Sequence, residues 1–345
     1  MKLINDYIQF ELENLSNPEP KIAIVGDLNY DYIYISPPLE SGKEVLISDF
    51  TRSLAGAAGY VASGLAKLGA KVHLLTQVGD DKDGKDLLKE ISSAGVIIDG
   101  IRIANGRKSA FTLIFTDKTE NRPRQVATYQ GTLKDLSIDY FKYEELLNQS
   151  DLVYSCNYFI LPRLREEIPY LFRYAKKINI LTAYDANSGY GWEDRKMLET
   201  LKKRIYPHTD LIFLNESEAY HLTGIKDPIK SIKIISPNSN TVVIKLGEKG
   251  VLARHLSKIY EVNVFPIQDK VKDTVGAGDS FQAAFIYFFL RRLPIEICTI
   301  LAEANAASTV QYYGGTKGQL NLDGVKNFIK RYKIYDEGNG KIMIK

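Results

Sequence analysis

Short apolar stretches alternate with amphipathic stretches along most of the chain. The run Lys21–Gly26 is nearly continuous in apolar residues, which is typical of a parallel strand buried on both faces. In Gly56–Leu68 the apolar residues recur at helical spacing, and Gly69 follows where the pattern stops. This order repeats, so we predict an α/β fold: a doubly wound, mostly parallel sheet with helices on both faces. Further strands are expected at 72–78, 152–155, 178–184, 211–214, 242–246 and near 251, and further helices at 84–94, 163–177, 193–203, 216–222 and from 278 and 294.

Two stretches rich in polar residues interrupt this alternation. Segment 36–53 carries isolated apolar residues, and segment 106–131 contains two expected strands, 109–116 and 124–129, joined by a polar turn at 117–123. We predict that they form a small β-sheet lid, because both lie beside strand ends where α/β proteins bind ligands. A β-hairpin without a gating role is the alternative. The remaining chain divides into an N-terminal extension (1–20), the α/β core (21–35, 54–105 and 132–330) and a C-terminal tail (331–345).

The composition excludes several classes of partner. With 45 basic and 42 acidic residues the net charge is +3, which is too balanced to indicate a nucleic acid or a membrane surface. The longest apolar run, Phe281–Leu290, is too short to span a membrane. Cys156 and Cys298 are the only cysteines, too few for a disulfide framework or a zinc site, so we expect a reducing, cytoplasmic location.

Two acidic residues and two glycines occur together just before that apolar run. Asp273 and Asp279 are six positions apart, and Gly276 and Gly278 lie between them. The glycines predict a tight turn into a buried helix, whose first N–H groups attract an anion. A carboxylate opposes anion binding by its charge, but it can accept the proton of a hydroxyl group that attacks a phosphate. The pattern therefore favours a small-molecule kinase, and an acidic helix cap is the alternative.

The chain resembles the ribokinase-like (PfkB) carbohydrate kinases over residues 21–325. The C-terminal signature of that family matches Asp273–Phe281, and the N-terminal signature matches Gly56–Gly69 and Gln77–Gly84. Both signatures occur in the expected strand-then-helix context, which makes the resemblance specific. It implies a small-molecule sugar acceptor, ATP, Mg²⁺ and, in many members, K⁺. It also implies a homodimer formed through the lids, and a lid that closes over the acceptor.

The resemblance assigns the catalytic roles to the glycine turn. Asp279 matches the general base that takes the proton from a sugar hydroxyl group. The backbone N–H groups of Gly276, Ala277 and Gly278 match the anion hole, which holds charge on the transferred phosphoryl group.

Three polar residues match positions linked to cations. Asn215 and Glu218 match an Asn-x-x-Glu motif, which implies phosphate positioning and Mg²⁺ held by Glu218, mostly through water. The same spacing is also a helix-capping arrangement. Asp273 matches a position near the monovalent cation, and an aspartate that stabilises the turn is the alternative.

Four residues match the nucleotide side. Lys245, Gly247 and Gly250 resemble the strand and turn beside the nucleotide phosphates. Lys245 replaces a small residue there, so it either contacts a phosphate or points outward. Asn305 matches a position near the adenine, and a buried asparagine that satisfies a helix is the alternative.

The acceptor side begins at the end of the first predicted strand. Asn29 and Asp31 match residues that hydrogen-bond sugar hydroxyl groups, and a turn-forming Asn/Asp cluster is the alternative. Gly56 is expected to let the backbone approach the sugar. Tyr60 replaces the asparagine usual in the family, which argues against ribose as the acceptor.

A second group of acceptor candidates lies in the middle of the chain. Asn187, within Asp185–Gly189, resembles the strand end of fructokinase-type and ketodeoxygluconate-type sugar kinases. Asn157 and Arg163 are further candidates for the pocket wall. The leading interpretation is an ATP-dependent sugar kinase, and the alternatives are a nucleoside kinase of the same fold, with Tyr60 stacking on a base, or an inactive sugar-binding sensor.

Overall fold

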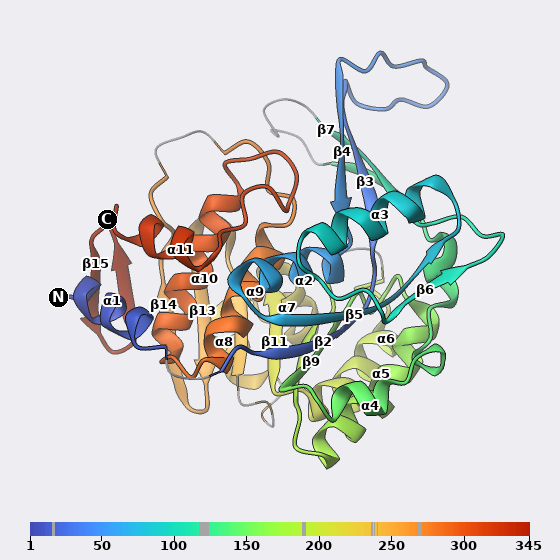
Figure 1. Cartoon of the computed structure of the whole chain (residues 1–345). Coiled ribbons are helices and arrows are strands. Elements are labelled where there is room, and N and C mark those ends of the chain that lie inside the picture. The colour runs from blue at the N-terminus through green and yellow to red at the C-terminus, as the bar shows by residue number, and fades with distance from the viewer. Residues whose placement is uncertain are drawn as a thin grey trace.

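The computed structural model describes residues 1–15, 18–116, 124–187, 191–235, 237, 239, 241–267 and 271–345. A sheet of 12 strands forms its centre, and a second sheet of four strands stands apart from it (Figure 1). Helices cover the large sheet on both faces. The predicted α/β fold with a separate small β-sheet is confirmed.

The large sheet has a reversal in its strand order next to β2. From β2 the chain adds β5 and β6 on one side and β9, β10, β11 and β12 on the other, all in parallel. Such a reversal opens a crevice at the carboxyl ends of the strands, where α/β proteins bind ligands. The strands of the sheet, in spatial order, are β1 (Lys2–Leu3), β15 (Ile334–Gly338), β16 (Lys341–Ile344), β14 (Lys258–Val262), β13 (Val251–His255), β12 (Thr241–Lys245), β11 (Leu211–Asn215), β10 (Leu181–Asp185), β9 (Leu152–Cys156), β2 (Lys21–Val25), β5 (Lys71–Gly79) and β6 (Ile101–Ala104).

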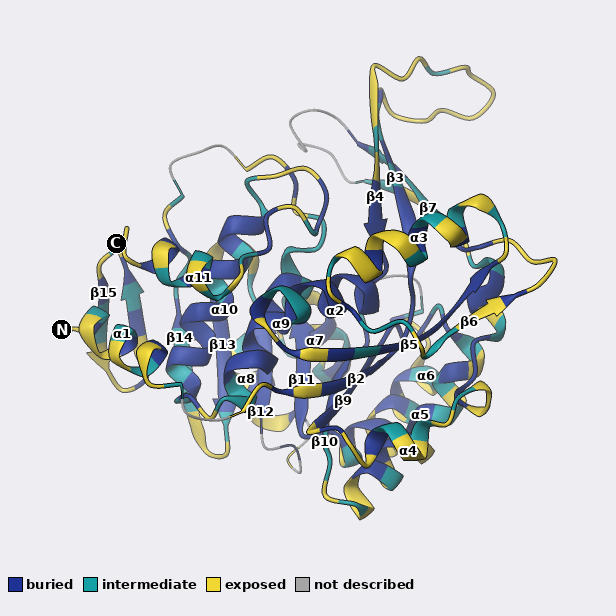
Figure 2. Cartoon of the chain, viewed as in Figure 1, coloured by how far each residue is buried: buried dark blue, intermediate teal, exposed yellow. Residues whose placement is uncertain are grey.

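The helices form one hydrophobic core on each face of this sheet. One core contains residues of α1 (Asn5–Glu13), α2 (Ala57–Leu68), α3 (Lys82–Ser93), α9 (Ala277–Leu290), α10 (Ile295–Thr309) and α11 (Leu322–Ile329). The other contains residues of α4 (Tyr143–Leu147), α5 (Pro162–Lys177), α6 (Arg195–Thr200), α7 (Glu216–Thr223) and α8 (Pro228–Ile234). Helix α9 is buried along most of its length (Figure 2) because it packs between α2 and α10.

The small sheet is the predicted lid, and its strand order is β4 (Asp49–Ala55), β3 (Asn29–Ile35), β7 (Phe111–Thr116) and β8 (Gln125–Tyr129). Strands β7 and β8 match the two strands expected within 106–131. Strand β3 differs from the expectation, because we assigned its residues to the core. It pairs with β4 along its whole length, and no run of residues in 36–48 forms a strand. The turn predicted at 117–123 lies outside the described residues.

The two ends of the chain meet at one edge of the large sheet (Figure 1). Strand β1 pairs with β15, and β16 pairs with β14 in parallel, so the segments predicted as an extension and a tail both join the sheet. Ile8 and Leu12 of α1 are buried in the adjoining core. Among the described residues, no helix is long and apolar enough to cross a membrane.

Candidate functional site

A cavity of about 430 Å³ lies in the crevice of the large sheet, beneath the lid. Its floor is formed where five neighbouring parallel strands end. Because parallel strands end at one edge of a sheet, residues far apart in the sequence converge there. These floor residues are Asp27 after β2, Asn157 after β9, Asn187 after β10, Asn215 at the end of β11 and Lys245 at the end of β12.

The glycine turn forms one wall of this cavity. Gly276 has a φ of 72°, a left-handed conformation that favours glycine, and a Cβ atom there would lie 2.6 Å from the Cα atom of Gly315. Among the described residues, no side chain caps the start of α9. The Ala277 N–H donates to the Thr274 carbonyl oxygen at 3.4 Å, a long hydrogen bond that an anion at this helix start could replace. Gly278 and Asp279 line the cavity beside this helix start. The sequence motif thus folds as the predicted turn.

Two carboxyl groups in the cavity have strongly perturbed protonation. Burial raises the pKa of Asp279 to about 8, although the ammonium group of Lys245 acts in the opposite direction. Burial likewise raises the pKa of Asp31 to about 7, against hydrogen bonds from Tyr60 and Asn29 that lower it. Carboxyl groups with a pKa near neutrality are suited to accept and release protons.

Lys245 points into the site. Its ammonium nitrogen lies 2.9 Å from a carboxylate oxygen of Asp185, which is 1% exposed in its side chain. Burial by itself lowers the pKa of Lys245, but the carboxylates of Asp185, Glu218 and Asp279 raise it overall, so the group stays charged. A Cβ atom on Gly278 would lie 3.2 Å from this ammonium nitrogen. Of the two orientations left open by the sequence, the structure has the inward one.

Asn215 and Glu218 form a reciprocal capping box at the start of α7. The Glu218 N–H donates to the Asn215 side-chain oxygen, and the Asn215 N–H donates to the Glu218 carboxylate, both at 2.8 Å. The capping alternative is therefore present, yet both side chains also line the cavity.

Among the described residues, no three His, Cys, Asp or Glu side chains gather into a metal site. Mg²⁺ commonly uses one or two carboxylates plus phosphates and water, which Glu218 fits.

Asp273 stabilises the turn and contacts the lid. Its carboxylate accepts hydrogen bonds from the N–H groups of Val275 and Gly314, both at 2.9 Å. Arg124, directly before β8, donates to the same carboxylate at 3.2 Å and to the Thr274 hydroxyl oxygen at 2.7 Å. Asp273 is buried and does not line the cavity. The turn-stabilising alternative is thus observed, and the role in cation binding stays a prediction.

The acceptor end of the cavity contains Asn29, Asp31, Gly56 and Tyr60. The Asn29 amide and the Tyr60 hydroxyl group both donate to the Asp31 carboxylate, at 3.2 Å each. Gly56 has a φ of 88°, and a Cβ atom there would lie 2.6 Å from the Asp27 carbonyl oxygen. The backbone of Gly56 therefore lies close to the backbone of Asp27, and its expected approach to the sugar stays a prediction.

Two left-handed asparagines extend this acceptor end. Asn157 and Asn187 have φ values of 61° and 59°, and the Asn187 amide donates to the Asn157 side-chain oxygen at 2.9 Å. Strained backbone of this kind clusters at functional sites. Arg163, in contrast, lies on the surface of α5 in ion pairs with Asp139 and Glu167, outside this cavity. Of the motif that contains Asn187, residues 188–190 lie outside the described part of the chain.

Besides Asp273 and Arg163, four further predicted residues do not line the cavity: Ala277, Gly247, Gly250 and Asn305. Asn305 is fully buried in α10, where its side-chain oxygen accepts the Leu320 N–H at 3.0 Å. Gly250 has a φ of 91° in the turn between β12 and β13, and a Cβ atom there would lie 2.1 Å from the Val262 carbonyl oxygen. Their contacts with a nucleotide stay predictions.

The sequence alone predicted a lid over the site, but it did not identify Asp27 or the lid residues Thr112 and Thr128 as parts of the site. The Asp27 carboxylate accepts the N–H groups of Ala57 and Ala58, both at 3.1 Å, and so caps α2 from a distant loop. Thr112 and Thr128 line the cavity from β7 and β8, where they face each other across the pair. Successive side chains of a strand point to opposite faces, so alternate residues of β7, such as Thr112 and Ile114, face the cavity. This alternation is the sequence signal that could have identified them.

Three comparisons with known proteins bear on this site. The protein named 5-dehydro-2-deoxygluconokinase from Clostridium tetani is 26% identical over 351 residues, which cover 99% of each chain. The crystal structure of a putative ribokinase II from E. coli has a TM-score of 0.78 and 19% identity, covering 90% of this chain and 99% of that one. The ribokinase from Cryptococcus neoformans, solved with ADP, has a TM-score of 0.77 and 20% identity over the same shares.

The structural similarities establish the ribokinase fold, and a family model identifies the chain more specifically. The model described as "pfkB family carbohydrate kinase" matches residues 19–321. That range includes both sequence signatures, the lid and every residue that lines the cavity. The chain belongs to the pfkB family of carbohydrate kinases.

Proposed function

We propose that the protein transfers a phosphoryl group from ATP to a hydroxyl group of a sugar or a sugar acid. One observation carries the proposal: Asp279 and the glycine turn line the same cavity as Asn29 and Asp31 of the lid. An acceptor hydroxyl group and a phosphate can therefore meet at a single carboxylate. The relatives named 5-dehydro-2-deoxygluconokinase, which match this chain over nearly its whole length, support a sugar acid as the acceptor.

In the proposed reaction, the residues of the glycine turn have different chemical roles. Asp279 accepts the proton of the attacking hydroxyl group, for which its raised pKa of about 8 is suitable. The N–H groups of Gly276, Ala277 and Gly278 and the ammonium group of Lys245 stabilise negative charge on the phosphoryl group. When bound, ATP supplies that group, and Mg²⁺ neutralises the phosphates. Glu218 would hold Mg²⁺ through water, and Asp273 would contribute to a K⁺ site.

The lining of the acceptor end favours a sugar over a nucleoside. Among the described lining residues, Tyr60 is the single aromatic one. Tyr60 is buried, and its hydroxyl group donates to Asp31. The edge of its ring packs against Gly315, so closely that a Cβ atom on Gly315 would clash with the ring. Tyr60 therefore positions Asp31 and offers no open face to a base. The other polar groups at this end are amides, hydroxyl groups and a carboxylate, which suit the hydroxyl groups of a sugar.

An acceptor screen with ADP release as the readout tests this proposal. Sugars, sugar acids including 5-dehydro-2-deoxygluconate, and nucleosides are each supplied with Mg²⁺ and ATP. We expect turnover with a sugar or sugar acid and none with nucleosides. Turnover confined to nucleosides would overturn the acceptor assignment, and the absence of turnover with every acceptor would overturn the kinase assignment.

We also propose that two copies associate through their lids. Among the described residues, no further strand pairs with the outer strands β4 and β8 of the small sheet, and exposed edges readily pair. Phe50 on β4 is 61% exposed and Val126 on β8 is 59% exposed. Light scattering after size exclusion should give the mass of two chains, and Phe50→Lys should give the mass of one. A monomeric wild type would refute the association.

A further inference from the structure

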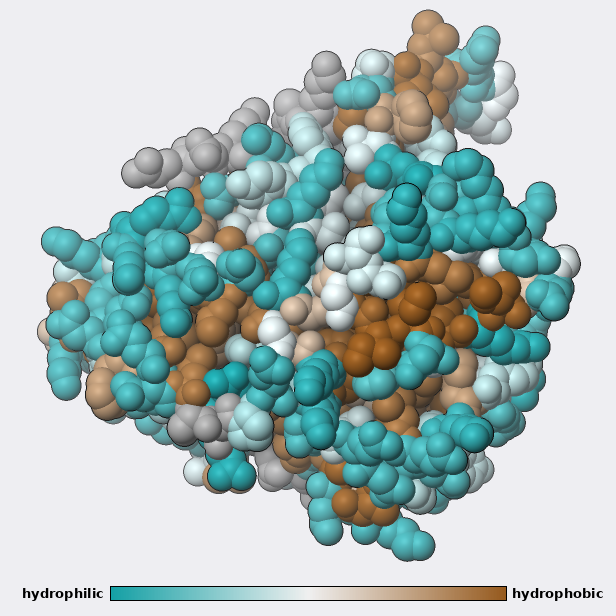
Figure 3. Space-filling view, in the orientation of Figure 1, coloured by the Kyte–Doolittle hydropathy of each residue, from teal (hydrophilic) through white to brown (hydrophobic). Residues whose placement is uncertain are grey.

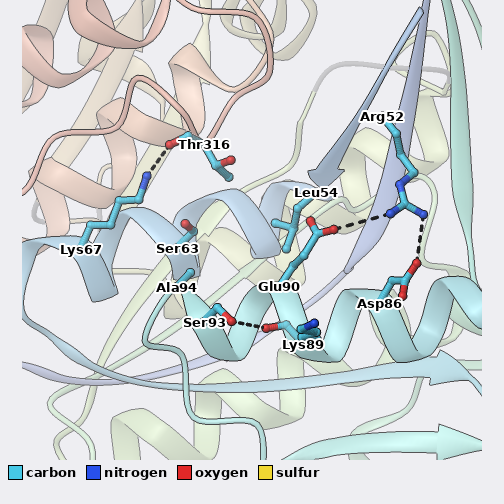
Figure 4. A pocket seen from close by; sticks show the side chains of 10 residues that line it. All are labelled: Arg52, Leu54, Ser63, Lys67, Asp86, Lys89, Glu90, Ser93, Ala94 and Thr316. Atoms are coloured by element: carbon cyan, nitrogen blue, oxygen red, sulfur yellow. Dashed lines mark hydrogen bonds and ion pairs between the residues drawn. The ribbon is translucent and has the colours of Figure 1, made fainter.

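A second cavity of about 500 Å³ lies outside the candidate active site, between the lid and α3 (Figure 4). Residues of β4, α2 and α3 and the segment after α10 form its walls. Among the described residues, none lines both cavities. Of the described residues that line it, only Leu54 and Ala94 are apolar, and the others carry charged or hydroxyl groups. Its volume falls in the usual range for small-molecule sites, about 300–1,000 Å³.

Two cationic groups of this cavity have no acidic partner. Lys67 donates to the carbonyl oxygen of Thr316, and neither Lys67 nor Lys89 pairs with a carboxylate among the described residues. Burial lowers the pKa of Lys67, because its charge is poorly compensated. At the other side of the view in Figure 4, Arg52 is already paired with Asp86. The Lys67 side of the cavity therefore attracts an anion.

Ser63 adds a hydroxyl group to the lining of this cavity near Lys67. The residue is 1% exposed, and Figure 4 draws no hydrogen bond between Ser63 and the other residues that line the cavity. It lines the cavity between Lys67 and the Arg52 pair. A hydroxyl group that lines a cavity can donate a hydrogen bond to an acceptor atom of a ligand.

We propose that this cavity binds a phosphorylated sugar. The phosphate accepts from the Lys67 ammonium group and the Ser63 hydroxyl group, and the exposed Lys89 adds positive charge at the rim. The cavity is larger than a phosphate ion requires, and Asp86 and Glu90 lie at its other side, where carboxylates can accept hydrogen bonds from sugar hydroxyl groups. Figure 3 shows hydrophilic residues over α3 beside this cavity, which suits a charged, hydrated ligand.

The second cavity is connected to the active site by one short segment. Thr316, the partner of Lys67, follows Gly315. Gly315 packs against Gly276 and Tyr60, since a Cβ atom on Gly315 would lie 2.9 Å from one and 2.6 Å from the other. A ligand that draws Lys67 from the Thr316 carbonyl oxygen therefore acts on the segment that supports the glycine turn. Occupancy should change the turnover of ATP.

Calorimetric titration tests the binding without requiring turnover, so its outcome is independent of the proposed kinase reaction. Glucose 6-phosphate and fructose 6-phosphate are titrated into the full chain with ADP and Mg²⁺ present. We expect one site, weakened about tenfold by Lys67→Met and by Lys89→Gln, because each removes a charged contact. Lys85→Gln is the matched control: Lys85 is exposed on the same helix as Lys89 but does not line the cavity.

Further titrations show whether the phosphate group, the sugar or the active site accounts for the binding. Inorganic phosphate and glucose should each bind more weakly than glucose 6-phosphate, and Asp31→Asn, at the acceptor end, should leave the titration unchanged. Phosphate that binds as tightly as the sugar phosphates would overturn the sugar assignment. Absence of binding, or binding that Lys89→Gln and Ser63→Ala leave unchanged, would overturn the site. These two variants also serve if Lys67→Met does not fold.

Discussion

Two groups of carboxylates lie on opposite sides of lid strand β3. Successive residues of a strand point to opposite faces, and here Asp31 faces the active-site cavity while Tyr30 and Tyr32 face α3. The hydroxyl group of Tyr30 donates to Glu90 at 2.7 Å, and that of Tyr32 donates to Asp83 at 3.0 Å. One strand thus separates a buried acidic site from a partly exposed one.

The two sides show that surroundings, more than residue type, set the chemistry of a carboxylate. On the outer side, hydrogen bonds from Lys82 and Arg52 lower the pKa of Asp86. On the inner side, burial raises the pKa of Asp279 to about 8. The raised pKa of Asp279 lets it exchange a proton near neutral pH, whereas the lowered pKa of Asp86 does not, so the inner side is suited to the proposed catalysis.

The largest expected effect comes from removing the inner base. Asp279→Asn keeps the shape of the side chain but cannot accept a proton, so turnover should fall by about 10²–10⁴. ADP release with the acceptor found in the screen measures it. The matched outer variant is Asp86→Asn, which should retain turnover. Wild-type turnover in Asp279→Asn would refute the proposed mechanism.

The ion pair between Lys245 and Asp185 should contribute more to stability than an exposed pair nearby. Lys245→Met leaves the Asp185 carboxylate buried without its cation, which costs about 3–5 kcal/mol of unfolding free energy. Urea unfolding measures this loss. Lys249→Met is the control: Lys249 pairs with Glu216 at 3.2 Å but is 64% exposed in its side chain, so about 0–1 kcal/mol is expected. Equal losses would show that burial does not distinguish the pairs.

The inner carboxyl group should make activity and stability respond oppositely to pH. Asp279 acts as a base only when ionised, so turnover should rise with pH and level off above about 8. Its pKa in the folded protein lies above the value of about 3.9 for a free aspartate. Its contribution to stability is therefore complete below about pH 4 and is lost as the pH rises through 8.

Unfolding of the wild type and of Asp279→Asn, measured at pH 6 and pH 9, tests the stability half of this prediction. The wild type should lose more stability than the variant across that interval. A turnover profile that is flat between pH 6 and pH 9 would contradict the assignment of the base.

The smallest expected effect lies on the outer side. Arg52 pairs with Asp86 at 3.2 Å and stacks over the ring of Tyr30, but its side chain is 31% exposed. Arg52→Gln should therefore cost about 1 kcal/mol or less in unfolding free energy. Thermal unfolding measures it. A loss as large as that of Lys245→Met would remove the contrast between the two sides.

Local patterns predicted most of what positions the site. The glycine turn before α9 and the polar residues at strand ends, such as Asn157 and Asn187, follow from short-range patterns and the family resemblance. Those residues meet because parallel strands end at one edge. Lys245 was left with two orientations, because the sequence does not reveal that Asp185, at the end of β10 and two strands away, draws it inward.

Contacts between distant segments could not be predicted. Arg124 reaches Asp273 across 149 positions, and no local pattern indicates that pairing. We assigned the residues of strand β3 to the core, within 21–35, whereas the pairing of β3 with β4 and β7 makes it part of the lid. Asn215 and Glu218 show a further limit, since one motif both caps a helix and lines the cavity.

The pairing of β1 with β15 brings the two ends of the chain close together. Its first strand, β1, and its last strand, β16, flank β15 at an edge of the large sheet, on the opposite side of the molecule from the lid loop 36–48 (Figure 1). A short linker could join Met1 to Lys345, and new ends could be opened in that exposed loop. Such a circular permutant should keep the sheet, and it would carry both of its termini on the lid.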